Sequence, residues 1–181
     1  MRYIIILTFS LACLSTCFAE PQHTNRFQIW LKGNNYRLGL QGKPVPMKFT
    51  AVDGRVVDLS QMRGKVVLVD FWETECEPCV AELPRIKAAF KKYQHKGFEV
   101  VGISSDTDKD KLERFLKEQE ITWPQYFEGQ QNNKFTVEFG INGFPHMFLV
   151  DKKGCLRFDN VFAFGAKANF EGKIKSLLAE Q

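Results

Sequence analysis

Apolar residues in this chain gather in short β-branched runs, and these runs alternate with stretches whose apolar positions repeat at helical spacing. The most continuous run, Val66–Val69, is typical of a strand that is buried on both faces of a sheet. Beyond Trp72 the spacing becomes helical, with apolar residues at Val80, Leu83, Ile86 and Phe90. The pattern therefore predicts a central strand that leads directly into a helix.

The rest of the pattern predicts further strands and helices in alternation. Asp53-Gly54 lies between two short apolar runs and indicates a β-hairpin near the start of the domain. The other expected elements are a strand at 98–104, a helix at 106–120, a short segment at 122–127, a short helix at 132–139, a strand at 147–150 with a hairpin partner at 155–161, and a helix at 166–179. This order predicts an α/β fold in which helices cover both faces of a mixed sheet.

Residues 1–43 do not share this pattern. Arg2 precedes an apolar run at 4–14, and small or neutral residues follow up to Ala19, which is typical of a signal peptide over 1–19. The run is too short to span a bilayer comfortably. A weaker alternative is lipidation of Cys17, whose preceding Thr16 fits a lipoprotein box poorly. We expect 20–43 to be a polar, partly ordered extension and 44–181 to be the folded domain.

Composition and charge exclude several classes of function. The chain is 44% hydrophobic, and 181 residues suffice for one well-filled domain. A net charge of +4 with both signs interspersed argues against a nucleic-acid-binding protein. The sequence contains no repeat that would indicate an array, and a monomer is the default expectation.

The cysteines carry the candidate chemistry. Once the predicted leader is removed, Cys76, Cys79 and Cys155 remain, which is too few for a framework of structural disulfides. Cys76-Glu77-Pro78-Cys79 falls where the central strand passes into the helix, and a helix N-terminus stabilises a thiolate. A zinc site would need a second pair of ligands at comparable spacing, and the sequence has none. The spacing therefore favours a redox pair, with Cys155 expected to be a half-buried strand residue.

These landmarks together resemble the thioredoxin superfamily and, within it, the exported thiol–disulfide oxidoreductases of the TlpA/ResA-like kind. The resemblance covers about 42–181 and implies a thioredoxin-like fold. It rests on Gly42-Lys43-Pro44-Val45-Pro46, on Arg63 to Trp72, on Cys76-Glu77-Pro78-Cys79, on Glu82-Leu83-Pro84, and on Gly143-Phe144-Pro145 before Phe148 to Asp151.

The resemblance implies roles for the two cysteines and for the proline loop. Cys76 would be the attacking, more exposed thiol, and Cys79 the buried thiol that resolves the mixed disulfide. Pro145 matches a cis-proline that lies against the redox pair and helps to dock an extended substrate, with Phe144 and Trp72 beside it. No cofactor is expected beyond the redox-active disulfide itself.

The resemblance also implies an acid near the buried thiol. Asp70 matches a buried acid of classical thioredoxins, and Glu82 matches an acid of the TlpA/ResA-like branch. Either could take the proton from Cys79, because burial in an apolar wall raises the pKa of a carboxyl group towards neutrality.

One departure from the family pattern bears on the direction of electron flow. Glu75 stands just before the first cysteine, where the family usually has a neutral residue, and Glu73 and Glu77 are close by. Three carboxylates oppose the helix dipole and should raise the pKa of Cys76, which disfavours a strong oxidant. We therefore expect a reductant of protein disulfides that is recharged by a membrane electron donor. In this family the cysteines of apocytochrome c are a common substrate.

Two other functions remain as alternatives. If His146 faces the cysteines, Cys76, Cys79 and His146 could hold copper, although copper chaperones of this fold separate their cysteines by three residues. The opening at 42–58 also resembles that of peroxiredoxins. Those enzymes need Ser or Thr three residues before the reactive cysteine, where this chain has Glu73 or Cys76, so a thiol peroxidase is the weaker alternative.

Overall fold

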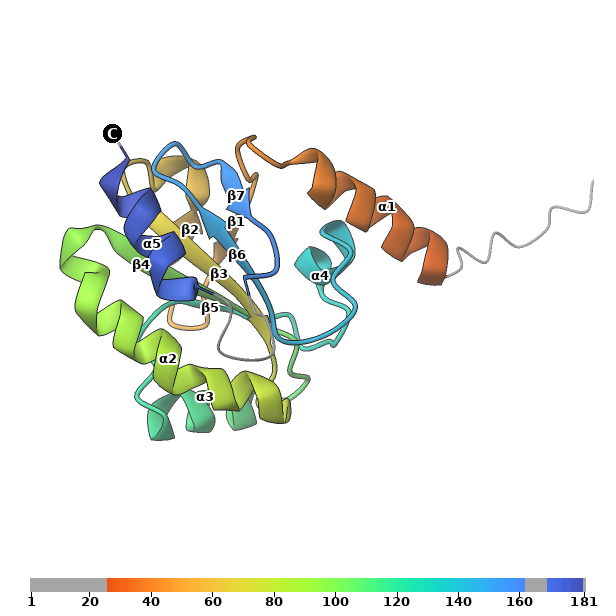
Figure 1. Ribbon diagram of the computed structural model, residues 1–181. Helices are drawn as coiled ribbons and strands as arrows, with labels where there is room; N and C mark the ends of the chain where they lie inside the picture. The colour runs from red at the N-terminus through yellow and green to blue at the C-terminus, as the bar shows by residue number, and fades with distance from the viewer. Residues whose placement is uncertain (1–25, 162–168, 181) are drawn as a thin grey trace, which may run out of the picture.

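A five-stranded mixed sheet forms the centre of the molecule, in the strand order β5-β4-β3-β6-β7 (Figure 1). The structure is a computed structural model, and it describes residues 26–161 and 169–180. The strands are β3 (Val66–Trp72), β4 (Phe98–Ser104), β5 (Gln125–Tyr126), β6 (His146–Val150) and β7 (Leu156–Phe158). The first three run parallel, whereas β6 is antiparallel to β3 and to β7. Every residue of β3 is buried, as its apolar run predicts.

Helices cover both faces of this sheet. The α2 (Glu77–Tyr93), α3 (Lys109–Glu118) and α5 (Phe170–Ala179) helices pack on one face, against Val66, Leu68 and Trp72 of β3. The α4 helix (Lys134–Glu138) and the hairpin of β1 (Lys48–Thr50) and β2 (Val56–Asp58) pack on the other. Short 3₁₀ turns follow β2 (Leu59–Gln61) and α2 (Gln94–Lys96). The predicted α/β architecture and N-terminal hairpin are confirmed.

The N-terminal extension is more ordered than its polar sequence predicts. Residues Arg26–Gly39 form α1, which lies beside α4 (Figure 1). Its many polar residues give only a weak helical pattern in the sequence. The helix packs on the domain through contacts between residues far apart in sequence, Gly33 with Gly140 and Arg37 with Phe139. The predicted signal peptide at 1–19, and Cys17 with it, lies outside the described residues. Among the helices that are described, none is long and apolar enough to span a membrane.

Candidate active site

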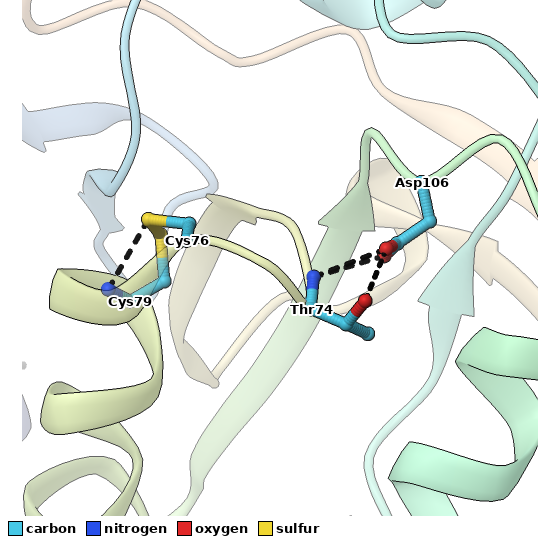
Figure 2. Close-up of a disulfide and its surroundings, with 4 residues drawn as sticks. All are labelled: Thr74, Cys76, Cys79 and Asp106. Atoms are coloured by element: carbon cyan, nitrogen blue, oxygen red, sulfur yellow. Dashed lines mark hydrogen bonds between the residues drawn. A yellow bond between two sulfur atoms is a disulfide. The ribbon is translucent and has the colours of Figure 1, made fainter.

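Cys76 and Cys79 form a disulfide at the start of α2, with 1.99 Å between the sulfur atoms and 5.2 Å between the Cα atoms (Figure 2). Cys76 is the N-cap residue of α2, and the backbone N–H of Cys79 donates to its Sγ at 3.2 Å. Cys76 is 9% exposed and Cys79 is 3% exposed, so Cys76 is the more exposed residue of the pair. A thiolate formed on Cys76 would gain this hydrogen bond and the positive end of the helix dipole.

A buried carboxylate fixes the loop between β3 and the disulfide. Asp106 accepts hydrogen bonds from the backbone N–H and the hydroxyl of Thr74, at 3.1 and 2.6 Å (Figure 2). It also accepts one from the Ser104 hydroxyl at 2.8 Å. Asp106 was not among the site residues expected from the sequence. Its signal was the polar Ser104-Ser105-Asp106 at the end of β4, because the ends of neighbouring parallel strands meet, here Trp72 opposite Ser104.

Asp70 lies on the disulfide side of β3. Residues alternate between the faces of a strand, and Leu68 and Trp72 pack in the same core cluster as both cysteines. Asp70 is buried, and its Oδ1 makes no hydrogen bond within the described structure. Burial, reinforced by the charge of Glu82, raises the pKa of Asp70 to about 7. A carboxyl group with this pKa can accept or release a proton near neutral pH.

Glu82, on α2, has a cationic partner that the sequence did not suggest. Arg85 Nε lies 2.9 Å from Glu82 Oε2, although these two buried atoms lack hydrogen-bond geometry. The Arg85 guanidinium also stacks over the Phe170 ring, 4.7 Å from its centroid. Arg85 therefore balances the charge of Glu82, whereas Asp70 has no cation beside it among the described ion pairs.

The three acidic residues near Cys76 differ in burial and in ion pairing. Lys111, on α3, forms an ion pair with Glu75 at 2.5 Å. The Glu75 side chain is largely exposed, which screens its effect on Cys76 further. Glu73 is half-buried and Glu77 is exposed. The carboxylate that directly precedes Cys76 is thus paired with a cation, so the negative charge around Cys76 is smaller than three unpaired carboxylates would give.

The loop before β6 carries the proline singled out from the sequence. The Phe144–Pro145 peptide bond is cis. Pro145 is buried, and the half-buried Phe144 packs against the core clusters of both faces of the sheet. Trp72, by contrast, does not border a substrate surface as expected. It is 1% exposed, its indole N–H donates to Gln125 Oε1 at 2.9 Å, and its ring packs against Phe115.

His146 does not face the cysteines. Met147 packs in the cluster that contains the disulfide, so alternation along β6 directs His146 to the opposite face. Its ring lies edge-on to Phe71 and Phe148, and its Nε2 is 2.8 Å from Asp159 Oδ1. The copper site of Cys76, Cys79 and His146 is therefore contradicted. Across 26–161 and 169–180, no three His, Cys, Asp or Glu side chains converge to hold a metal ion. Cys155, the remaining cysteine of the predicted mature chain, is half-buried, as expected, and forms no disulfide within the described residues.

A thioredoxin-like sheet with a CxxC disulfide at the first turn of α2 defines a thiol–disulfide oxidoreductase of the TlpA/ResA-like kind. The Redoxin family profile matches residues 40–174, and the chain belongs to this family.

Proteins and solved structures similar to this chain agree with that class. The thiol-disulfide oxidoreductase ResA of Bacillus cereus is 26% identical over 137 residues, which is 75% of this chain and 78% of that protein. ResA of Oceanobacillus iheyensis is 35% identical over 121 residues, 66% of this chain and 62% of that protein. The thioredoxin domain of a thiol-disulfide oxidoreductase from Bacteroides vulgatus superposes with a TM-score of 0.64 at 26% identity, covering 76% of this chain and 97% of that one. A thiol:disulfide interchange protein from Chlorobium tepidum gives a TM-score of 0.64 at 26% identity, covering 77% and 98%.

Proposed function

We propose that this protein is exported and reduces disulfides in other proteins through Cys76 and Cys79. The observation that carries the proposal is the placement of Cys76, the more exposed residue of the pair, at the N-cap of α2. In the reduced protein, the Cys76 thiolate attacks one sulfur of a substrate disulfide, which forms a mixed disulfide and releases the other substrate sulfur as a thiolate. Cys79 then attacks Cys76 Sγ and releases the second substrate thiol. Two electrons pass to the substrate, and the Cys76–Cys79 disulfide is left.

The second step needs a base, because a thiol must lose its proton before it attacks. We assign this role to Asp70, whose pKa of about 7 suits proton transfer near neutral pH and whose side chain lies on the disulfide side of β3. Glu82 is the second candidate. Its carboxylate lies 2.9 Å from Arg85 Nε, and its negative charge helps to raise the pKa of Asp70.

Docking of the substrate is assigned to the loop at Phe144 and Pro145. Both residues precede β6, which pairs with β3, the strand that leads to the disulfide. An extended substrate chain can run past this loop with its cysteine at Cys76. The resemblance to the TlpA/ResA-like branch suggests apocytochrome c cysteines as substrates and a membrane protein as electron donor. The leader pattern at 1–19 supports export.

The reduction potential of the Cys76–Cys79 couple, measured in glutathione buffers, tests the direction of electron flow. A value near or below about −250 mV, close to that of thioredoxin, is expected for a reductant. A value above about −150 mV would place the protein with oxidants and overturn the reductase function. Cys79→Ser is the control, since it retains the attacking thiol but cannot close the internal disulfide.

A further inference from the structure

The α1 helix lies outside the part of the chain that matches the Redoxin family. The match begins at residue 40, whereas α1 spans Arg26–Gly39. The helix nevertheless packs closely on the domain. A Cβ atom added at Gly33 would lie 2.4 Å from the backbone nitrogen of Gly140, so the two backbones touch where only glycine fits. The helix is therefore an addition to the family fold that is held by direct backbone contact.

A buried arginine holds the same helix at a second point. Arg37 Nη1 donates to the carbonyl oxygens of Phe139 and Gly140 at 2.6 and 3.2 Å. Its Nε donates to Asp159 Oδ2 at 3.0 Å, and the other Asp159 oxygen contacts His146, the residue after Pro145. Since Gly33 and Arg37 lie one helical turn apart, they fix one face of α1 against the end of α4 and the loop that leads to the cis-proline.

A pocket with a volume of about 810 Å³ lies between α1, α4 and this loop. Its apolar lining includes Ile29 from α1, Val137 from α4, and Ile141 and Phe144 from the loop. Ile29 and Val137 are 36% and 42% exposed, which is unusual for large aliphatic side chains in this structure. No charged residue lines the pocket within the described chain. Gly143 and Phe144 belong to its lining, and the next residue in the chain is Pro145, so the pocket borders the loop proposed to dock the substrate.

We propose that this pocket binds an uncharged, apolar side chain that flanks the reacting cysteine of the substrate polypeptide, and that α1 supplies the outer wall. The inference rests on the proposed function and adds a substrate class to it. An extended chain that runs past Phe144 and Pro145 with its cysteine at Cys76 places neighbouring side chains at the pocket. An aliphatic or aromatic side chain loses apolar surface to water there, whereas a carboxylate would lose its hydration without a cationic partner.

Two synthetic peptides test the proposal. Each has one cysteine, blocked as a mixed disulfide with 5-thio-2-nitrobenzoate, and carries either Leu or Asp at both positions two residues from the cysteine. Stopped-flow absorbance gives the second-order rate constant for reaction with the reduced protein. The wild type is expected to react at least tenfold faster with the Leu peptide than with the Asp peptide. Equal rate constants would overturn the inference.

A matched pair of variants on one helix tests the part played by α1. Gly33→Ala introduces a clash with the Gly140 backbone, whereas a Cβ at Gly39 meets no atom within 4 Å. Both substitutions favour helix formation, so they differ in docking alone. Gly33→Ala should lower the Leu/Asp ratio towards one, and Gly39→Ala should leave it unchanged. If Gly33→Ala fails to fold, Ile29→Asp, at a partly exposed lining position, should lower the same ratio.

Two further results separate this inference from the proposed function. A Leu/Asp ratio that stays at the wild-type value in both Gly33→Ala and Ile29→Asp overturns the role of α1. If neither peptide reacts with the reduced wild type, the proposed function fails and the inference with it. Rates of reaction with free 5,5′-dithiobis(2-nitrobenzoate), a small disulfide, should be equal in all variants, because Cys76 itself is unchanged. A rate that falls in parallel for this reagent would mean that the pocket variants damage the site instead, and would overturn the assignment.

Discussion

Asp70 and Asp159 lie on opposite sides of one sheet, and their pKa values move in opposite directions. Burial and the charge of Glu82 raise the pKa of Asp70 to about 7. Burial also raises the pKa of Asp159, but the hydrogen bond from His146 and the charge of Arg37 outweigh it, so the pKa stays below its usual range. The hydrogen-bonded and charged partners of a buried carboxyl group, and not burial alone, therefore decide whether its pKa rises or falls.

The difference separates a group that can transfer protons from a group that fastens two elements together. Asp159 joins Arg37 of α1 to His146 of β6, and its charge is satisfied. Asp70 has an oxygen without a hydrogen-bond partner in the described structure, and it lies on the side of the sheet that carries the Cys76–Cys79 disulfide. A buried carboxyl group with a raised pKa is a candidate for proton transfer, which is the role proposed above for Asp70. Three substitutions test this difference between the two carboxyl groups.

The largest effect is expected from Asp70→Asn. The unfolded chain ionises Asp70 near its ordinary pKa of 3.8, whereas the folded protein does so at about 7. The folded state therefore holds the proton more tightly, and the stability of the wild type falls as the pH rises from about 4 to about 7. A difference of about three pKa units corresponds to a loss on the order of 4 kcal/mol, complete above pH 7. Asn cannot ionise, so the variant should escape this loss.

Urea unfolding of the oxidised protein between pH 4 and pH 8 measures this effect. The advantage of Asp70→Asn over the wild type should grow with pH and level off above pH 7. The exposed substitution Glu113→Gln, on α3, is the control and should give a curve parallel to that of the wild type. Parallel curves for Asp70→Asn as well would show that Asp70 ionises normally. The same variant should slow release of the mixed disulfide if Asp70 is the base.

Arg37→Met should have the next largest effect, on the other side of the comparison. Met keeps the apolar stem of the side chain but removes the donors to Asp159, Phe139 and Gly140. Removal of one partner from a buried ion pair costs on the order of 3 kcal/mol, because the remaining charge is left unpaired. Urea unfolding at pH 7 measures the loss. Lys32→Met, at an exposed position of the same helix, should change stability by less than about 0.5 kcal/mol.

Thr74→Val should have the smallest effect of the three. Asp106 is a buried carboxylate like Asp70 but, like the half-buried Asp159, it has several hydrogen-bond partners. Val removes the Thr74 hydroxyl with little change in shape, which should cost about 1–2 kcal/mol. Thr74→Ser restores the donor and should recover most of the loss. An unchanged stability in Thr74→Val would mean that the Asp106 cluster does not hold the loop before Cys76.

The sequence predicted those parts of the fold whose signals are local. The fully apolar run of β3 and the Asp53-Gly54 turn specify their own structure, and Cys76 to Cys79 lie within one turn of a helix. The helix at α1 could not be predicted in this way, because its docking depends on a contact between Gly33 and Gly140, which are far apart in sequence. The position of Arg85 over the Phe170 ring is also a contact between residues far apart in sequence, whereas its ion pair with Glu82 has the local i,i+3 spacing of a helix and could have been predicted.

Two errors at the site came from treating position in sequence as position in space. Trp72 is near the cysteines in sequence, but it belongs to a strand that is buried on both faces, so its side chain cannot reach a substrate. His146 follows Pro145, but strand alternation directs it to the opposite face. For His146, strand alternation alone would have given the correct direction, whereas for Trp72 the decisive fact is burial, since it lies on the same side of the sheet as the cysteines but is 1% exposed.

The hydrogen bond from the Cys79 N–H to Cys76 Sγ gives one atom two roles. The sulfur proposed as the nucleophile is also the hydrogen-bond acceptor at the N-cap of α2. The side chains of Asp108 and Asn133 have this N-cap role in α3 and α4. Loss of a helix cap costs about 1 kcal/mol, so Cys76→Ala would shorten or loosen a helix as well as remove a nucleophile. Serine keeps an acceptor at this position. Cys76→Ser is therefore the substitution that isolates chemistry from architecture.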